Sequence, residues 1–306
     1  MDETAAGGGI LSGIGWVLQN IAMSFYNLGY AITHPASWLD WSDPTAVMRF
    51  IYYGASVELW FIVVTFFLVL FAIGLWKRSF LWGVVIGLEF FGNWVGRFFA
   101  WAGLLMVLQQ VVIVFIQRIF ARPDIVLGFG IPVGFDISWW AEELKLFNAM
   151  VVALCLAYTF IQGGHVRVDL VYSAVSFRTK RIIDMLGSLF FMIPMATLIW
   201  LYTWYFQWRS LIVPPVNPTD PLDRMEMKAR ALRWNVETIG FSPNGFTAYF
   251  LFKILMVIMV GMIFIQAWTF FFRSYLEFVE GEESEGKYLD RDQVETGEEA
   301  YDHAEF

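Results

Sequence analysis

Few residues in this chain are of the types that perform catalysis or hold cofactors. Its three histidines, His34, His165 and His303, fall in a connecting segment, at the end of an apolar stretch and near the C-terminus. A haem would need axial ligands, often histidines that face one another inside a helical bundle. Nucleophile-elbow, zinc-protease and phosphate-loop motifs are also missing from the sequence. We therefore predict that the chain is not an enzyme and has no cofactor or metal site.

The single cysteine, Cys155, excludes a disulfide framework and a cysteine-based metal centre. It lies in the uncharged stretch 146–164, where apolar surroundings disfavour the thiolate form that makes a cysteine reactive. We expect a small packing residue at this position.

The stretch around Cys155 is about as long as a helix needs to be to cross a bilayer. Charged and titratable residues crowd both of its ends, an abrupt change that is unusual for a buried helix of a soluble protein. These flanking residues are Glu142, Glu143, Lys145, His165, Arg167 and Asp169. The sequence therefore predicts a membrane span over 146–164.

The composition predicts an all-α integral membrane protein. The chain is 58% hydrophobic and 19% aromatic, with a mean hydropathy of +0.58, well above an ordinary soluble domain. Its net charge of −8 is uneven: residues 277–306 hold 12 acidic and 2 basic residues, a net −10, which leaves +2 for the rest. A nucleic-acid partner is disfavoured because no basic patch with interleaved aromatics occurs. The acidic segment 280–306 is predicted to be a solvated, disordered tail.

Further apolar stretches predict the remaining helices. Residues 10–32 are uncharged and place apolar residues at spacings of three and four, which favours an amphipathic helix on the membrane or against other helices; a true span is the alternative. The predicted spans are 50–76, 98–117, 146–164, 182–206 and 246–272. The segment 121–137 is expected to be a loop, and a helix is expected within 224–239.

The segment 80–96 is the ambiguous one, because too few residues precede Arg118 for two spans and a turn. Glu89, Asn93 and Arg97 stand four residues apart and would form one polar stripe on a helix. We expect an interfacial or partner-packed helix that leads into the span at 98–117. Two pairs of glycines in small-xxx-small spacing would let other helices approach closely: Gly83 with Gly87, and Gly92 with Gly96.

Basic residues in short loops indicate the orientation. The 163–181 loop carries Arg167, Arg178, Lys180 and Arg181, and Lys77 and Arg78 stand two crossings earlier. Both positions are therefore expected on the cytoplasmic side. The segments 118–143 and 207–245 are then expected outside, and the acidic tail inside.

Three stretches carry a resemblance to a known family. They are VIVFIQRIFARP from Val112, ISWWAEELKLFNAMVVALCLAYTF from Ile137, and GGHVRVDL from Gly163. From about Asn93 to Val279, the chain resembles the small membrane subunit of tripartite ATP-independent periplasmic (TRAP) transporters, the DctQ-like family. Each stretch alone is a weak signal, whereas their order and the spacing of the four spans around them are more specific.

The resemblance implies a four-helix scaffold in the bacterial inner membrane that pairs with a large permease. A periplasmic substrate-binding protein would deliver the solute, often a carboxylate, and a sodium gradient would drive uptake. We divide the chain into an N-terminal extension (1–91) with an amphipathic helix and an extra span, a DctQ-like four-span domain (92–279) and the acidic tail (280–306). The extension, the enlarged 207–245 loop and the tail depart from the family pattern. They leave open an alternative, a DctQ-like accessory or scaffold subunit recruited to another membrane complex.

The candidate structural and partner-binding residues lie at the span ends. Arg118 and Glu143 flank the predicted outer loop, where they would form an ion pair or reach the interface separately. Trp139 and Glu142 share the start of the second family-like span with Glu143. On the inner side, His165, Arg167 and Asp169 would fix the loop against lipid headgroups or a partner.

Overall fold

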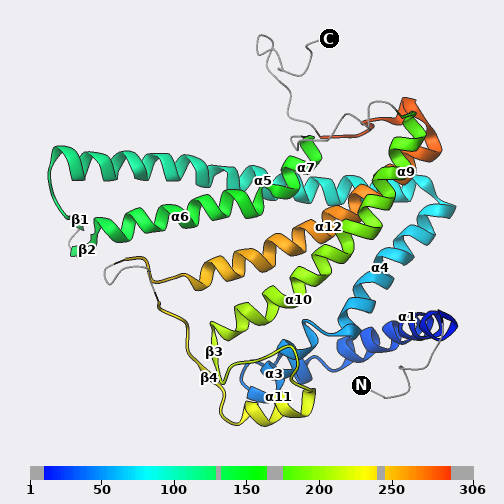
Figure 1. The fold of residues 1–306 in the computed structure, drawn as a ribbon, viewed down its shortest axis with the longest axis horizontal. Coiled ribbons are helices and arrows are strands. Elements are labelled where there is room, and N and C mark those ends of the chain that lie inside the picture. Colours follow the sequence, from blue (N-terminus) through cyan, green and yellow to red (C-terminus); the bar gives the residue numbers. More distant parts are fainter. Residues whose placement is uncertain (1–9, 129–131, 164–174, 240–244, 291–306) are drawn as a thin grey trace. The chain divides into compact units, whose positions relative to one another are not determined.

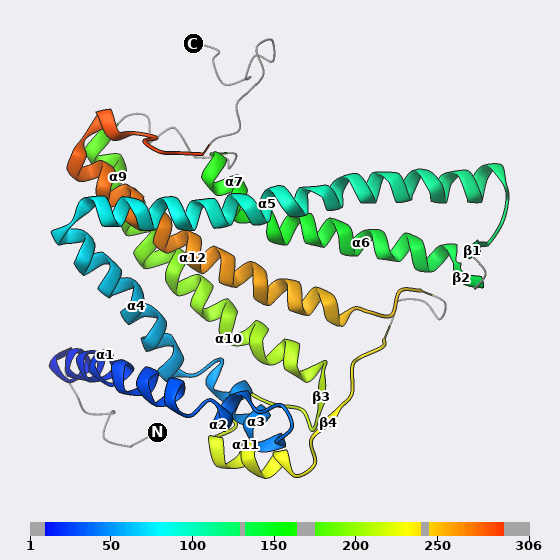
Figure 2. The ribbon, with the colours of Figure 1, turned by 180° about the vertical axis from the view of Figure 1, so that it is seen from behind.

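The computed structural model describes residues 10–128, 132–163, 175–239 and 245–290, and it is built almost entirely from helices (Figures 1 and 2). Among the described residues, four helices are long and apolar enough to cross a membrane, and a bent helix pair makes a fifth candidate. This confirms the predicted all-α membrane fold. The chain forms two compact units: residues 1–81 with 194–260, and residues 82–193 with 261–306.

In the first unit, α1 (Ile10–Thr33) packs along α4 (Val57–Trp76), and the ring of Trp16 meets Phe61 edge-on at 5.3 Å. The helix expected over 10–32 is therefore present. Of its polar residues, Ser24 is buried and donates to the carbonyl of Ile21, whereas Ser12 and Gln19 are exposed. Its apolar stripe is exposed, as a lipid-facing helix requires; this stripe comprises Leu11, Ile14, Leu18, Phe25, Leu28 and Ile32.

A small folded module, which we call the head, belongs to the same unit. It combines α2 (Ala36–Leu39) and α3 (Pro44–Tyr53) with β3 (Ile212–Val213), α11 (Leu222–Ala229) and β4 (Arg233–Trp234). Helices α3 and α11 lie side by side, and β3 pairs with β4 in antiparallel register. The helix expected within 224–239 thus ends early and gives way to a strand. Parts of the predicted N-terminal extension and of the 207–245 segment thus fold together into one module.

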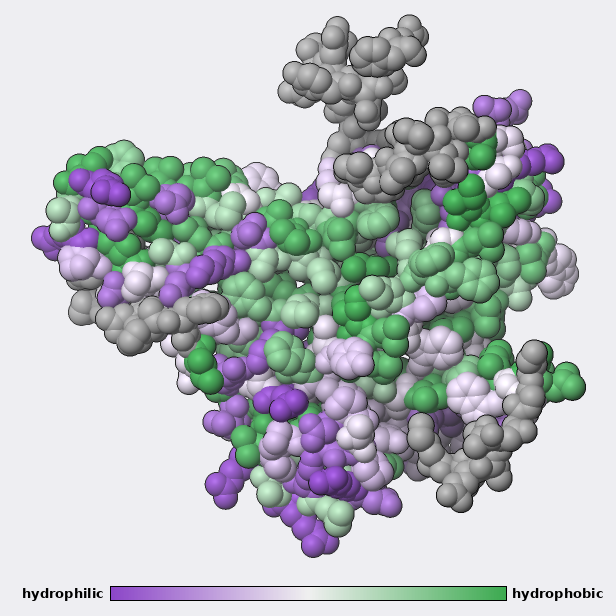
Figure 3. Space-filling view, in the orientation of Figure 1, coloured by the Kyte–Doolittle hydropathy of each residue, from purple (hydrophilic) through white to green (hydrophobic). Residues whose placement is uncertain are grey.

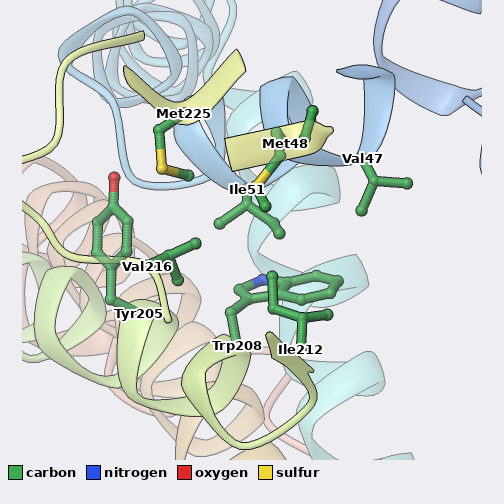
Figure 4. Packing of buried hydrophobic residues seen from close by; sticks show 9 residues of the cluster. Val47, Met48, Ile51, Tyr205, Trp208, Ile212, Val216 and Met225 are labelled. Atoms are coloured by element: carbon green, nitrogen blue, oxygen red, sulfur yellow. The ribbon is translucent and has the colours of Figure 1, made fainter. Parts of the chain in front are cut away.

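The head has its own apolar core, shown in Figure 4. Its buried residues are Val47, Met48, Ile51, Tyr205, Trp208, Ile212, Val216, Met225 and Ala229. Beside this core, Trp204 donates its indole N–H to the carbonyl of Ile51 at 2.8 Å. A Cβ atom on Gly54 would lie only 2.1 Å from the Trp204 ring, so this turn requires glycine.

Helix α5 (Arg78–Val114) continues into a π-helical turn, η2 (Phe115–Ile119), as one continuous helix. The helix expected over 80–96 thus leads directly into the span expected over 98–117. A helix of this length extends about 60 Å, roughly twice the hydrocarbon thickness of a bilayer. The glycines at 92 and 96 are covered by packed side chains, and they do not interrupt the helix.

The span expected over 146–164 is bent. Helix α6 (Ile137–Leu154) and helix α7 (Leu156–Gln162) meet at Cys155 with an angle of 43°. Where a loop was expected before α6, β1 (Asp124–Gly128) and β2 (Pro132–Asp136) pair as antiparallel strands. Helices α5 and α6 run side by side in opposite directions (Figures 1 and 2).

The last two spans are longer than predicted. Helix α9 (Phe177–Gly187), the π-helical η3 (Ser188–Met192) and α10 (Ile193–Arg209) form one continuous helix, and α12 (Phe250–Glu280) runs eight residues beyond its predicted end. A short 3₁₀ turn, η4 (Glu282–Ser284), follows. Residues 281–290, the start of the segment predicted to be a disordered tail, are thus part of the fold. We call them the C-terminal strap.

Candidate functional site

A buried ionic cluster in the second unit is the main concentration of charged side chains among the described residues. It joins α5, α9, α12 and the C-terminal strap, at the helix ends expected on the cytoplasmic side. Its members are Glu89, Arg181, Asp184, Arg273, Glu277 and Glu285. Within one helix, only residues close in sequence can meet. In this cluster, residues far apart in the sequence meet because separate helices pack together.

The pair formed by Arg273 and Glu89 is a buried link between α12 and α5. Arg273 donates from Nε and Nη2 to the two carboxylate oxygens of Glu89, each at 2.6 Å. The side chains are only 10% and 5% exposed. A third contact joins Arg273 Nη1 to Glu277, one turn further along α12, at 3.3 Å. Such two-pronged guanidinium–carboxylate contacts fix orientation as well as distance.

Arg181, at the start of α9, connects the cluster to the strap. Its guanidinium lies 2.9 Å from Glu277, 3.2 Å from Asp184 and 2.6 Å from Glu285 of the strap. The contact with Glu277 joins Nε to Oε2, and neither atom meets hydrogen-bond geometry. We regard it as an ion pair, because both atoms are buried and opposite in charge at 2.9 Å.

The cluster does not have the composition of an anion-binding or metal site. Four carboxylates face two guanidinium groups, a formal net charge of −2. Within the described parts of the chain, no group of three or more His, Cys, Asp or Glu side chains is arranged to hold a metal ion. The cavity among these side chains measures about 100 Å³, room for a few water molecules but not for an organic acid. The arrangement can hold helices in place.

The polar stripe predicted on α5 is bound by the end of the strap. Arg97 donates to both carboxylate oxygens of Asp290, at 2.8 and 3.1 Å, and Asn93 donates to the carboxylate and to the backbone carbonyl of Asp290. Gln162 of α7 donates to the same carbonyl at 2.9 Å. The hydrogen bond from Arg97 is the main cause that holds the pKa of Asp290 below its usual value.

A second set of contacts holds the strap to the start of α5. Trp82 donates its indole N–H to Glu280 at 2.8 Å, and its ring meets Tyr288 edge-on at 5.6 Å. Lys287 lies over the rings of Trp82 and Tyr288 and contacts Glu280 at 3.3 Å. Sequence reasoning missed these strap residues. The polar stripe on α5 was the one signal that could have indicated a polar partner.

In the structure, Glu143 contacts a different residue from Arg118, its predicted partner. Gln109 of α5 donates to Glu143 at 3.1 Å and to the carbonyl of Trp140, and no described contact joins Arg118 to Glu143. Arg118 is exposed in η2. The reason is the register: Ile113 already packs on Ile137, the first residue of α6. Arg118 lies five residues further, about 7 Å beyond the start of that helix.

The other predicted site residues are only partly described. Trp139 and Glu142 are half-buried on α6, and the ring of Trp139 meets Trp140 edge-on at 6.0 Å. His165, Arg167 and Asp169 lie outside the described residues. Their role in fixing the inner loop stays a prediction.

In the first unit, Lys253 near the start of α12 does not simply reach toward water. It binds Glu237 and lies 4.5 Å above the ring of Phe206. These residues line an open cavity of about 520 Å³ together with Arg209. A glutamate thus already neutralises the one lysine of this cavity.

Long apolar helices, joined by buried ion pairs in the second unit, define a polytopic membrane protein. Residues 129–216 match the family model described as "Tripartite ATP-independent periplasmic transporters, DctQ component". The chain therefore carries a DctQ domain, the small permease component of TRAP transporters, as its resemblance to the family predicted. Such a component is a multi-pass protein of the inner membrane and implies partners within a TRAP complex. No curated protein and no solved structure matches the chain.

Proposed function

We propose that this chain is a scaffold subunit that supports a large permease in sodium-driven, binding-protein-dependent uptake of an organic acid or a related solute. By itself it would transport nothing. Its helices would enlarge and anchor the stationary part of the permease in the bilayer. The head would be a surface available to a periplasmic binding protein.

The observation that carries this proposal is an unoccupied face of α5. Gly83 and Gly87 stand one turn apart, and a Cβ atom on either would meet no other atom within 4 Å. Phe90 and Trp94 continue the same face and are 61% and 58% exposed. Small residues flanked by large apolar ones are the pattern that lets helices pack closely in membranes.

The second glycine pair of α5 provides an internal comparison. A Cβ atom on Gly92 would lie 2.9 Å from Ile161, and one on Gly96 would lie 2.2 Å from Tyr158. The second glycine pair is therefore already covered by α7 of the same chain. The first pair has the same spacing, and no described residue lies within 4 Å of a Cβ atom at either position, which favours a helix of a partner subunit as its occupant.

The pairing of the buried charged side chains is also consistent with a scaffold role. In the second unit, the buried acidic and basic side chains at the inner helix ends pair with one another and enclose a cavity too small for an organic acid. Burying an additional unpaired carboxylate in such surroundings would be costly. On the face drawn in Figure 3, apolar residues cover the middle of the helices, and hydrophilic ones lie over the head and at helix ends. This pattern suits a subunit that contacts lipid and partner helices.

Two measurements test the proposal. The chain alone, reconstituted into liposomes with a sodium gradient, should give no uptake from a panel of organic acids. Gradient-driven uptake without another protein would overturn the scaffold role. Purification in mild detergent should recover a large permease with the chain. Recovery of a different membrane complex would instead support the alternative, recruitment of the DctQ-like scaffold elsewhere.

Variants of α5 sharpen the second measurement. Gly83→Leu with Gly87→Leu should abolish recovery of the permease, because the two side chains would fill the free face. Ala100→Leu is the matched control, since Ala100 is exposed on another side of the same helix. If the wild-type chain, the double leucine variant and Ala100→Leu all recover the permease equally, this face of α5 is not the contact.

A further inference from the structure

We propose that the C-terminal strap is a releasable brace that fixes α7 against α5, and that it opens from its Asp290 end. The inference concerns the internal mechanics of the second unit and does not depend on the transport role. It assigns a conformational function to a segment whose acidic composition alone predicts disorder.

Helix α7 needs such a brace because it is short and bent away from α6. It has seven residues, and a helix of that length is marginal in isolation. Its 43° bend separates it from the longer helix before it. It ends at Gly163, whose backbone is left-handed with φ of +76°, so the helix cannot continue. The position of α7 therefore depends on its neighbours.

Two groups of contacts hold α7 to α5. The first lies along its side: Ile161 and Tyr158 pack over the glycines at 92 and 96, and the Cys155 thiol donates to the carbonyl of Gly96 at 3.3 Å. The second lies at its end, where Gln162 donates to the backbone carbonyl of Asp290 at 2.9 Å, and its contact with Asn93 is longer, at 3.4 Å. A hydrogen bond at the end of the helix therefore passes through the strap.

The strap is anchored unequally along its length. Near its start, the backbone N–H of Gly286 donates to the buried Glu277, and the carbonyl of Lys287 accepts from the buried Arg273. Glu285 also binds the buried Arg181, although its own side chain is 58% exposed. At its end, the side chains of Asp290 and Arg97 are 49% and 38% exposed. Salt screens exposed ion pairs far more than buried ones. Release therefore begins at Asp290, while the buried cluster stays closed.

This order of release links the strap to the last turn of α7. When Asp290 leaves Arg97 and Asn93, its carbonyl also leaves Gln162, and the last turn of α7 loses this hydrogen bond. A cationic segment of a partner protein, or a rise in ionic strength, could drive this step by competing for the Asp290 carboxylate. The strap would thereby control how firmly the last turn of α7 is held.

Hydrogen–deuterium exchange of the full chain in detergent tests the proposal. Asp290→Asn should speed exchange of the amides of residues 159–163 about five- to tenfold, the change expected for the loss of one or two hydrogen bonds. Gln162→Ala should do the same while the strap itself stays protected. Glu283→Gln is the matched control: Glu283 is exposed in the same strap, and the structure gives it no ion pair. It should leave exchange unchanged.

A salt titration of the wild-type chain provides the second measurement and needs no mutation. Exchange at residues 159–163 and 287–290 should rise together between low and high salt, while the amides around Glu277 stay protected. Unchanged exchange of the last turn of α7 in Asp290→Asn, with the strap released, would overturn the proposal. Faster exchange of the strap amides at high salt, without faster exchange of the last turn of α7, would also overturn the proposal.

Discussion

Arg273 of α12 and Glu89 of α5 stand 184 residues apart in sequence, yet two nitrogens of the arginine meet both oxygens of the glutamate at 2.6 Å. We expect Arg273→Ala to destabilise the second unit by about 3–5 kcal/mol, because it leaves a carboxylate buried without its partner. Glu89→Ala should cost a similar amount. Reversible unfolding in mild detergent would measure both.

The double variant Glu89→Leu with Arg273→Met separates charge pairing from packing. Apolar side chains of similar volume remove both charges together, so the loss should be clearly smaller than the sum of the single losses. Glu283→Ala, at an exposed position, serves as the control. Strict additivity of the two single effects would contradict a direct buried pair.

The strap contact at Asp290 should depend on pH only in acid. The hydrogen bond from Arg97 lowers the pKa of the Asp290 carboxyl below its ordinary value of 3.8. The folded contact therefore gains stability that is fully present above that value and is lost as the pH falls through the lower, folded pKa. Limited proteolysis should find residues 287–290 equally protected from about pH 5 to 8 and exposed only below about pH 4.

Two observations would check the assignment of this acid transition. The other groups that face Asp290, Asn93 and Gln162, do not titrate, and Arg97 stays charged throughout. Asp290→Asn should thus abolish the transition. A transition that persists in this variant would belong to another carboxylate of the strap.

The register of α5 against α6 makes Gln109, and not Arg118, the partner of Glu143. Gln109→Ala should destabilise the protein by about 1 kcal/mol, the usual net contribution of a hydrogen bond. Combined with Glu143→Ala, it should show coupling in a double-mutant cycle. Arg118→Ala with Glu143→Ala should be additive. Coupling between Arg118→Ala and Glu143→Ala would instead support the ion pair that the sequence suggested.

The predicted orientation can be tested at exposed positions in the head and in the strap. In a Cys155→Ala background, Asp223→Cys should react with a membrane-impermeant thiol reagent in intact cells, and Glu283→Cys should not. Both side chains are exposed in the structure, so lack of reaction reports sidedness and not burial. After the cells are broken, both should react. The reverse pattern would invert the assignment of inside and outside.

The sequence by itself determined the class of this protein. Uncharged stretches of bilayer length, a single Cys155 and three scattered histidines predicted a helical membrane subunit without catalysis, and the DctQ match agrees. These features are local, because hydropathy and residue type act over one helix or one motif. The glycine pairs and the polar stripe on α5 were likewise visible as patterns, although their occupants were not.

Only the tertiary structure decided which side chains meet. Composition averaged over 277–306 predicted disorder, because an acidic segment with few apolar residues cannot bury enough surface to offset the entropy of ordering. Glu285 and Asp290 nevertheless hold residues 281–290 of the predicted tail in place, because Arg181 of α9 and Arg97 of α5 bind their side chains. Glu143 meets Gln109 for the same kind of reason: Ile113 and Ile137 set the register between two helices. Pairings between distant segments depend on helix length, register and bend angle, and no local pattern encodes these.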